Sequence, residues 1–335
     1  MPDHNGKKAP RAAGVLIVSE ADCQRLVSAR RAFDAVESVF AAMAGGNAYN
    51  FPVIREAIGH ADALYGFKSG FDRAGLALGV KSGGYWPGNA DRGLTNHQST
   101  VFLFNPDTGQ LKAVVGGNYL TAVRTAASSS VSIAHLARKD ARVLGMIGAG
   151  HQAQFQLRAA AEQRDFERVL AWNPHPEMLP KLAAVAGEIG LPFESVTAQD
   201  VCAGADVIIT ITSAFEPLLM ADWIRPGTHL ACMGTDTKGK QEVDSALAAR
   251  SSVFTDEVAQ SISIGEMQHA VAAGTLAEGD ITPIGAVINA THPGRTSDDQ
   301  ITLFDGTGVG LQDLAVAEVA ARAAATEAEP NIVAL

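Results

Sequence analysis

The sequence predicts an α/β protein with two units: a doubly wound parallel sheet covered by helices, and an α+β unit with an antiparallel sheet. Three observations lead to this prediction. Between residues 143 and 255, short apolar strands alternate with helical segments, and between residues 50 and 120, β-like segments are broken by glycine and turn residues. The length of 335 residues suits two domains of roughly 130 to 200 residues each better than one core.

The α+β unit begins with a strand at Val15 to Val18, followed by a polar cap at 19–22 and a helix that ends at Gly45. Further strands are expected at 63–68, 76–82, 100–104 and 112–115, and a turn at 105–109 joins the last two into a hairpin. An alanine-rich helix from Gly310 to Ala325 is expected to pack back against this unit.

The parallel unit follows a helix-compatible stretch at 121–138. Strands are predicted at 143–147, 169–172, near 193, at 207–211, 229–233 and 253–255, with helices at 151–163 and from about residue 177 to 187. Nearly all-apolar strands such as VIITIT and LACMG are typical of a parallel sheet covered on both faces.

Composition and charge exclude several classes of function. The chain carries 26 Lys and Arg against 36 Asp and Glu, a net charge of −10, which offers no attraction for nucleic acid or an anionic membrane surface. Cys23, Cys202 and Cys232 are widely spaced and are expected to be reduced, mostly buried thiols, so no metal site is predicted. The first dozen residues do not form a signal peptide, and no stretch reaches the ~18 apolar residues of a membrane span. We therefore expect a soluble, cytoplasmic protein.

The segment Gly148-Ala149-Gly150-His151-Gln152-Ala153 indicates a dinucleotide site. It directly follows the apolar strand at 143–147 and opens a helix, which is the context that a G-x-G-x-x-A turn needs. Gly148 permits the tight turn, Gly150 lets the backbone approach a pyrophosphate, and Ala153 allows close helix–strand packing. The free N–H groups of the helix N-terminus would face the phosphates, as in a Rossmann fold.

The second strand of this unit ends at Asn173, where the residue that contacts the adenosine ribose is expected. An acidic residue there would indicate NAD, and a nearby arginine would indicate NADP. The sequence has neither at this position. Without an arginine for a 2′-phosphate, NAD(H) is favoured and NADP(H) remains possible.

Cationic side chains occur at intervals along the β-rich half of the chain. Lys81 stands at the end of an apolar strand, and Arg124 lies among small residues that would let a flat partner approach. An arginine fork with a lysine is a common way to bind a carboxylate, so an amino or oxo acid substrate is indicated. The full set is Arg55, Lys68, Lys81, His97 and Arg124.

Five ordered motifs carry a family resemblance: NHQSTVFLFNPDTG, GGNYLTAVRTAA, VLGMIGAGHQA, ADVIITITS and MGTDTKGKQEVD. Together they resemble the ornithine cyclodeaminase/mu-crystallin family over residues 15 to 325. The resemblance implies a Rossmann domain, residues 131–306, inserted into a substrate-binding and homodimerisation domain, residues 1–130 plus 307–335.

By position, the resemblance implies that Arg55, Lys81 and Arg124 bind the substrate carboxylate and that Asp236 lies beside the substrate nitrogen. His97 and Thr100 fall in the segment that lines the pocket, whereas Lys238 and Lys240 are expected to be solvated. The predicted cofactor contacts are Thr125, Gly148, Ala149, Gly150, His151, Gln152, Asn173, Thr212, Ser213, Met233 and Gly234.

The loop at 82–89 and the segment GHADALYGFKSGFDRAG look most like the iminosuccinate reductase branch. This implies hydride transfer from NAD(P)H to a small α-imino acid, with iminosuccinate giving L-aspartate. Lys68 or His97 could supply the further cation that suits a dicarboxylate. Lys81 and Asp236 are the catalytic candidates, with Lys81 the best candidate for proton transfer because burial and nearby cations lower a lysine pKa.

Three alternatives remain open at the level of the sequence. An ornithine cyclodeaminase would need an extra carboxylate near the substrate tail, which the cation-rich first unit does not offer. An alanine dehydrogenase would differ only in the substrate side chain. A non-enzymatic ligand-binding protein is disfavoured by the presence of Lys81, Asp236 and the whole glycine turn.

Overall fold

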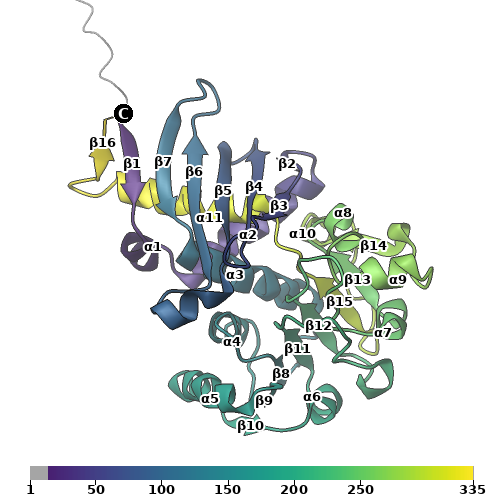
Figure 1. The fold of residues 1–335 in the computed structure, drawn as a ribbon. Helices are drawn as coiled ribbons and strands as arrows, with labels where there is room; N and C mark the ends of the chain where they lie inside the picture. The colour runs from purple at the N-terminus through teal and green to yellow at the C-terminus, as the bar shows by residue number, and fades with distance from the viewer. Residues whose placement is uncertain (1–13, 335) are drawn as a thin grey trace, which may run out of the picture.

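The computed structural model describes residues 14–334, which form two eight-stranded sheets with a long helix between them (Figure 1). The first sheet has the order β16-β1-β7-β6-β5-β4-β2, with β3 paired to β4. Its strands are β1 (Val15–Val18), β2 (Ala48–Asn50), β3 (Ile54–Ala57), β4 (Leu64–Asp72), β5 (Ala77–Tyr85), β6 (His97–Phe104), β7 (Leu111–Gly116) and β16 (Ile332–Val333).

Strands β2 to β7 pair antiparallel, which confirms the antiparallel sheet predicted for this half, and β1 adds to β7 in parallel. The helices of this half are α1 (Glu20–Leu26), α2 (Ala29–Ala44) and α11 (Gly310–Ala325). The alanine-rich α11 packs across one face of the sheet, and its small side chains allow a close approach (Figure 1). Its expected return to the first unit is confirmed.

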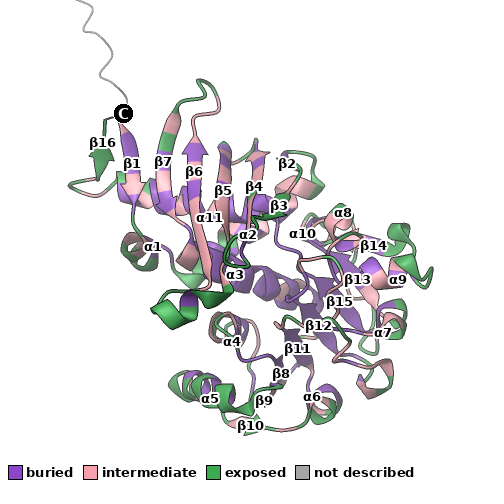
Figure 2. Ribbon diagram, in the orientation of Figure 1, coloured by how far each residue is buried: buried purple, intermediate pink, exposed green. Residues whose placement is uncertain are grey.

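The second sheet has the order β10-β9-β8-β11-β12-β15-β13-β14, and every neighbouring pair is parallel. Its strands are β8 (Val143–Ile147), β9 (Arg168–Trp172), β10 (Phe193–Ser195), β11 (Val207–Thr210), β12 (His229–Cys232), β13 (Ser252–Thr255), β14 (Ile281–Pro283) and β15 (Thr302–Asp305). The helices are α4 (Ala153–Ala161), α5 (Leu179–Glu188), α6 (Ala198–Gly204), α7 (Ser245–Arg250), α8 (Val258–Ser261), α9 (Gln268–Ala272) and α10 (Ile284–Ile288). The central strands are buried along their whole length, which confirms the predicted Rossmann-type parallel sheet (Figure 2).

Several elements differ from the sequence prediction. The single helix expected before Gly45 is two helices, because Ser28 caps a second start at α2. The helix after the glycine turn begins at Ala153 rather than His151, since Gly150 to Gln152 form a turn closed by the Ala153 N–H to the Gly150 carbonyl. The sequence prediction missed the short strands β2, β3, β14, β15 and β16.

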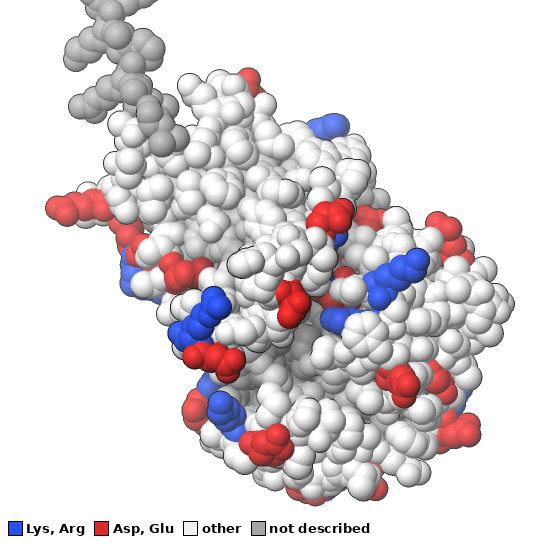
Figure 3. All heavy atoms as spheres, in the orientation of Figure 1, with Lys and Arg blue, Asp and Glu red and all other residues white. Residues whose placement is uncertain are grey.

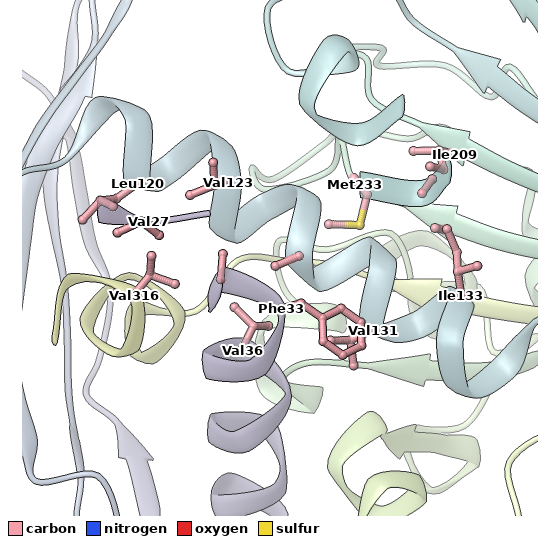
Figure 4. Close-up of a cluster of buried hydrophobic side chains, with 14 of the residues drawn as sticks. Val27, Phe33, Val36, Leu120, Val123, Val131, Ile133, Ile209, Met233 and Val316 are labelled. Atoms are coloured by element: carbon pink, nitrogen blue, oxygen red, sulfur yellow. The ribbon is translucent and has the colours of Figure 1, made fainter. Parts of the chain in front are cut away.

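Helix α3 (Asn118–Leu136) lies between the two sheets, and all its residues from Leu120 to Ile133 are buried. Figure 4 shows side chains of this helix, among them Leu120 and Val131, in one apolar cluster with Phe33 and Val316. Its serines and alanines let both halves of the molecule approach its axis. The predicted domain boundary at 130/131 falls inside this helix, and the division into domains remains a prediction.

All three cysteines are free and buried, as expected. Within residues 14–334, no helix combines the length and hydropathy that a membrane crossing requires.

Candidate active site

The glycine turn lies at the carboxyl end of β8. Gly148 has a φ of +110°, and a Cβ there would lie 2.6 Å from the Ile211 carbonyl oxygen, so the turn requires glycine. A Cβ at Gly150 would meet no atom within 4 Å, which leaves open space over the backbone. Beside it, Oε1 of Gln152 is buried without a hydrogen-bond partner among the described residues. The open space and the unpaired acceptor fit a dinucleotide pyrophosphate and its ribose hydroxyls.

Asn173 supports the turn. Its Oδ1 accepts a hydrogen bond of 3.1 Å from the Ala149 N–H, and its Nδ2 donates to the His175 carbonyl at 2.8 Å. His151 stays exposed, with its ring 5.4 Å from that of Phe155. The neutral Asn173 therefore fixes the backbone of the turn, a role that the sequence did not predict.

Four of the other predicted cofactor contacts lie at the same edge of the sheet. Thr212 and Ser213 follow β11, and Met233 and Gly234 follow β12. Both strands run parallel to β8, so their carboxyl ends meet near the glycine turn, where open α/β sheets bind ligands. Thr125 is buried in α3, where its hydroxyl donates to the Thr121 carbonyl.

A buried cluster of cations lies on the face of the first sheet that α11 covers. Lys68 and Lys81 are cross-strand partners on β4 and β5, and Lys81 is opposite the buried Val101. Lys81 Nζ lies 2.6 Å from Oδ2 of Asp313, and Arg124 Nε donates to Oδ1 of the same carboxylate at 3.0 Å. One fully buried carboxylate thus holds both cations.

The loop before α11 and the first turn of α11 complete this cluster. Arg124 Nη1 donates to Gln312 Oε1 at 3.0 Å, and Lys68 Nζ donates to the Gly308 carbonyl at 2.6 Å. Gly308 has a φ of +76°, and a Cβ there would lie 2.8 Å from Arg124 Nη1. Asp256 accepts hydrogen bonds from the N–H groups of Thr307 and Gly308, and these bonds fix the backbone of the loop.

A second ion-pair group surrounds Asp236. Arg55 Nη1 donates to Asp236 Oδ2 at 3.0 Å, and Lys240 Nζ donates to Oδ1 at 2.8 Å. The expectation that Lys240 is solvated is wrong: its side chain is only 17% exposed, because it also bonds the Gly234 carbonyl and closes the loop that carries Asp236. Lys238 is exposed, as expected.

These arrangements shift several pKa values. Burial, with the nearby charges of Arg124 and Lys68, lowers the pKa of Lys81 to about 7, although Asp313 opposes the shift. Burial and the charge of Arg124 also lower the pKa of Lys68. Burial alone would raise the pKa values of Asp313 and Asp236, but neighbouring cations hold that of Asp313 down to about 2 and that of Asp236 well below its usual range.

His97 and Thr100 separate onto opposite faces of β6. His97 alternates with Ser99 and Val101 and so shares the face of Lys81, whose charge, after burial, helps to lower the pKa of His97 to about 3. Thr100 pairs with Ser82 on the other face. The structure therefore places His97 with the cations as a neutral imidazole, and it does not bring Thr100 to them.

The sequence prediction missed Asp313, Gln312 and Asp256. Asp313 alone carried a signal, because it is an acidic residue on the apolar face of an alanine-rich helix, in line with Ala317 and Ala320. In the space-filling view, charged side chains gather around the hollow between the two halves of the molecule (Figure 3).

A glycine turn at the carboxyl edge of the parallel sheet, together with a cluster of buried cations on the antiparallel sheet and α3, defines a Rossmann-type dinucleotide-binding protein with an added α+β unit. The chain belongs to the ornithine cyclodeaminase/mu-crystallin family, whose model matches residues 15–327.

Two individual relatives and one solved structure are similar to the chain over most of its length. The chain is 62% identical to an iminosuccinate reductase of Paracoccus denitrificans over 91% of this chain and 95% of that protein. It is 34% identical to an alanine dehydrogenase of Archaeoglobus fulgidus over 91% of this chain and 93% of that protein.

 A crystal structure of the Paracoccus iminosuccinate reductase in complex with NAD⁺ superimposes with a TM-score of 0.93 at 59% identity, covering 96% of this chain and 100% of that one.

Proposed function

We propose that this chain is an NADH-dependent imine reductase that reduces a small α-imino acid, with iminosuccinate as substrate and L-aspartate as product. The observation that carries the proposal is the buried pair of Lys81 and Arg124 on one carboxylate, Asp313, in a chain that also carries the glycine turn. The 62% identity to a protein named iminosuccinate reductase supports the choice of substrate.

The cofactor proposal follows from the turn. The open space at Gly150 and the free Gln152 oxygen fit a pyrophosphate and ribose, and the similar structure was solved with NAD⁺. When bound, NADH would supply the hydride. The segment after Asn173 reads Pro-His-Pro-Glu and contains no arginine for a 2′-phosphate, so we favour NADH over NADPH.

The protein's own residues would bind and align the substrate. Arg124 and Lys81, with Arg55, present the cations that would bind a carboxylate. The buried Asp313 fixes the orientation of Arg124 and Lys81 before substrate arrives, and the partly exposed Asp236 does the same for Arg55. For the second carboxylate of a dicarboxylate, Lys68 and the neutral His97 remain the candidates. His97 would bind it as an N–H donor rather than as a cation.

Asp236 would place a negative charge beside the reacting nitrogen. Its lowered pKa keeps the carboxylate ionised at neutral pH, so it can stabilise an iminium cation. Lys81, with a pKa of about 7, exchanges a proton near neutral pH and is our candidate for proton transfer.

We further propose that the protein is a cytoplasmic homodimer. The face of the first sheet opposite α11 carries the cross-strand partners Ile54 and Phe67, whose exposed fractions are 54% and 39%. Exposed large apolar side chains that adjoin in this way are typical of an interface between protein surfaces.

One panel of assays tests the proposed function. NADH and NADPH oxidation would be measured with oxaloacetate, pyruvate and glyoxylate, each with ammonia. We expect the highest kcat/KM with NADH and oxaloacetate. A preference for pyruvate would instead indicate alanine dehydrogenase, and ammonia release from ornithine without net NADH oxidation would indicate ornithine cyclodeaminase.

A further inference from the structure

Glu242 is a fully buried carboxylate that the proposed reaction does not use. Both of its oxygens are saturated with hydrogen bonds. Oε1 accepts from the N–H and the hydroxyl of Thr212 at 2.8 and 2.7 Å. Oε2 accepts from the Thr210 hydroxyl at 2.6 Å and the Gly234 N–H at 2.9 Å. Four donors, from the end of β11 and from the loops that follow β11 and β12, thus meet at one side chain.

The two loops are those that follow β11 and β12, at the edge of the sheet where the glycine turn lies. Glu242 also closes the loop between Gly234 and itself, because it binds the N–H of the residue at which that loop begins. Asp236 lies inside this loop. The same carboxylate therefore fixes the predicted cofactor contacts at Thr212 and Gly234 and the base of the segment that carries Asp236.

A second layer of carboxyl groups holds Glu242 itself. Glu266 Oε1 accepts hydrogen bonds from the backbone N–H groups of Glu242 and Val243 at 2.8 and 2.7 Å. Asp305 Oδ2 in turn accepts from the Glu266 N–H at 2.9 Å. Each carboxyl group fixes the backbone of the next, so Glu242 has little freedom to move.

We propose that Glu242 is a positioning residue that sets the geometry between the loops that would hold the nicotinamide and the loop that carries Asp236. The inference rests on the proposed function in that NADH is taken as the ligand. It adds a residue that touches neither substrate nor cofactor but aligns the parts that do.

The test is Glu242→Gln, which keeps the size of the side chain but replaces one acceptor oxygen by an NH₂ donor. At least one backbone N–H, of Thr212 or Gly234, then loses its partner. We expect the Kd for NADH, measured by fluorescence titration, to rise about tenfold, and kcat to fall as Asp236 loses its position. Glu242→Asp keeps the charge but is shorter, and we expect it to recover part of the affinity.

Asp206→Asn is the matched control. Asp206 also accepts hydrogen bonds from two backbone N–H groups, those of Arg142 and Val143, but at the opposite edge of the same sheet. We expect this variant to lower Tm without changing the Kd for NADH more than twofold. If Glu242→Gln lowered Tm but bound NADH as tightly as the control and kept its kcat, the proposal would be overturned.

Thr210→Val serves if Glu242→Gln does not fold, since it removes only the hydroxyl that binds Oε2. We expect a rise of a few-fold in the Kd for NADH, and an unchanged Kd and kcat would contradict the proposal. Failure of the proposed function itself gives a different result: wild-type protein that binds no NADH, or that binds NADH but reduces no imine.

Discussion

At the level of single residues, Asp313 connects the two cations that we propose bind the substrate carboxylate. It is fully buried and contacts both Lys81 and Arg124, so it fixes their positions and influences their charge. Burial and the neighbouring cations lower the pKa of Lys81, and the negative charge of Asp313 raises it again. Removing that charge should therefore shift the protonation of Lys81 to lower pH.

Asp313→Asn tests this coupling. If protonated Lys81 is required, kcat/KM of the wild type falls as the pH rises through about 7. In the variant we expect the same decline at lower pH, with a loss of activity at neutral pH of at least about tenfold. Both proteins would be assayed with the same oxaloacetate and ammonia mixtures, so the pH dependence of imine formation cancels in the ratio of the two rates. A ratio that does not change with pH would contradict the role of Lys81.

Most elements near the site could be predicted from local sequence. Each of them shows, in its own residues, the apolar pattern that its burial requires. β8, the glycine turn and the buried α3 are examples. The strand β15 was not predictable in this way: it has four residues, ends in an aspartate, and becomes a central strand only through pairing with β12 and β13. The role of Asp313 likewise depends on where α11 packs, which no local pattern shows.

Helix α3 and the second sheet meet at His229, a buried residue of β12. Its ring nitrogens lie 3.1 Å from Ser132 Oγ on α3 and 3.0 Å from Thr302 Oγ1 on β15. Burial, with the charge of Arg295, lowers the pKa of His229 well below its usual value. The unfolded chain takes up a proton at this residue below about pH 6.5, whereas the folded chain does not.

We therefore expect His229 to reduce stability as the pH falls below about 6.5. His229→Asn removes the titrating group but keeps a polar side chain on β12. Although the variant is expected to be less stable at neutral pH, its Tm should fall less than that of the wild type between about pH 7 and about pH 5. Parallel Tm curves over this range would show that His229 does not titrate with unfolding.

The arrangement of the whole molecule explains how the site forms. The cations proposed to bind the substrate come from the first sheet and α3, the glycine turn proposed to bind the cofactor comes from the second sheet, and Asp313 comes from the C-terminal helix. Sequence motifs indicate each part separately. The way these parts come together follows from strand register and from the packing of α11, which are properties of the folded chain. Strand register also separates Thr100 from the cations.

The proposed dimer is also a property of the whole molecule. Placing a charge on the apolar face with Phe67→Lys should yield a monomer in sedimentation velocity, because burying an unpaired charge opposes association. Met178→Lys is the control, since Met178 is similarly exposed, at 37%, but lies beside α5 on the other half of the molecule. A Phe67→Lys protein that sediments like the wild type would place the interface elsewhere.

Hydride transfer to an imine carbon is the central claim, and isotope transfer tests it most directly. The protein would be incubated with oxaloacetate, ammonia and NADH carrying deuterium at both C4 positions, and the products would be examined by mass spectrometry and NMR. We expect L-aspartate with one deuterium at Cα. Deuterated malate in place of aspartate would show reduction of the ketone rather than the imine, and aspartate without deuterium would show that the cofactor does not deliver the hydride.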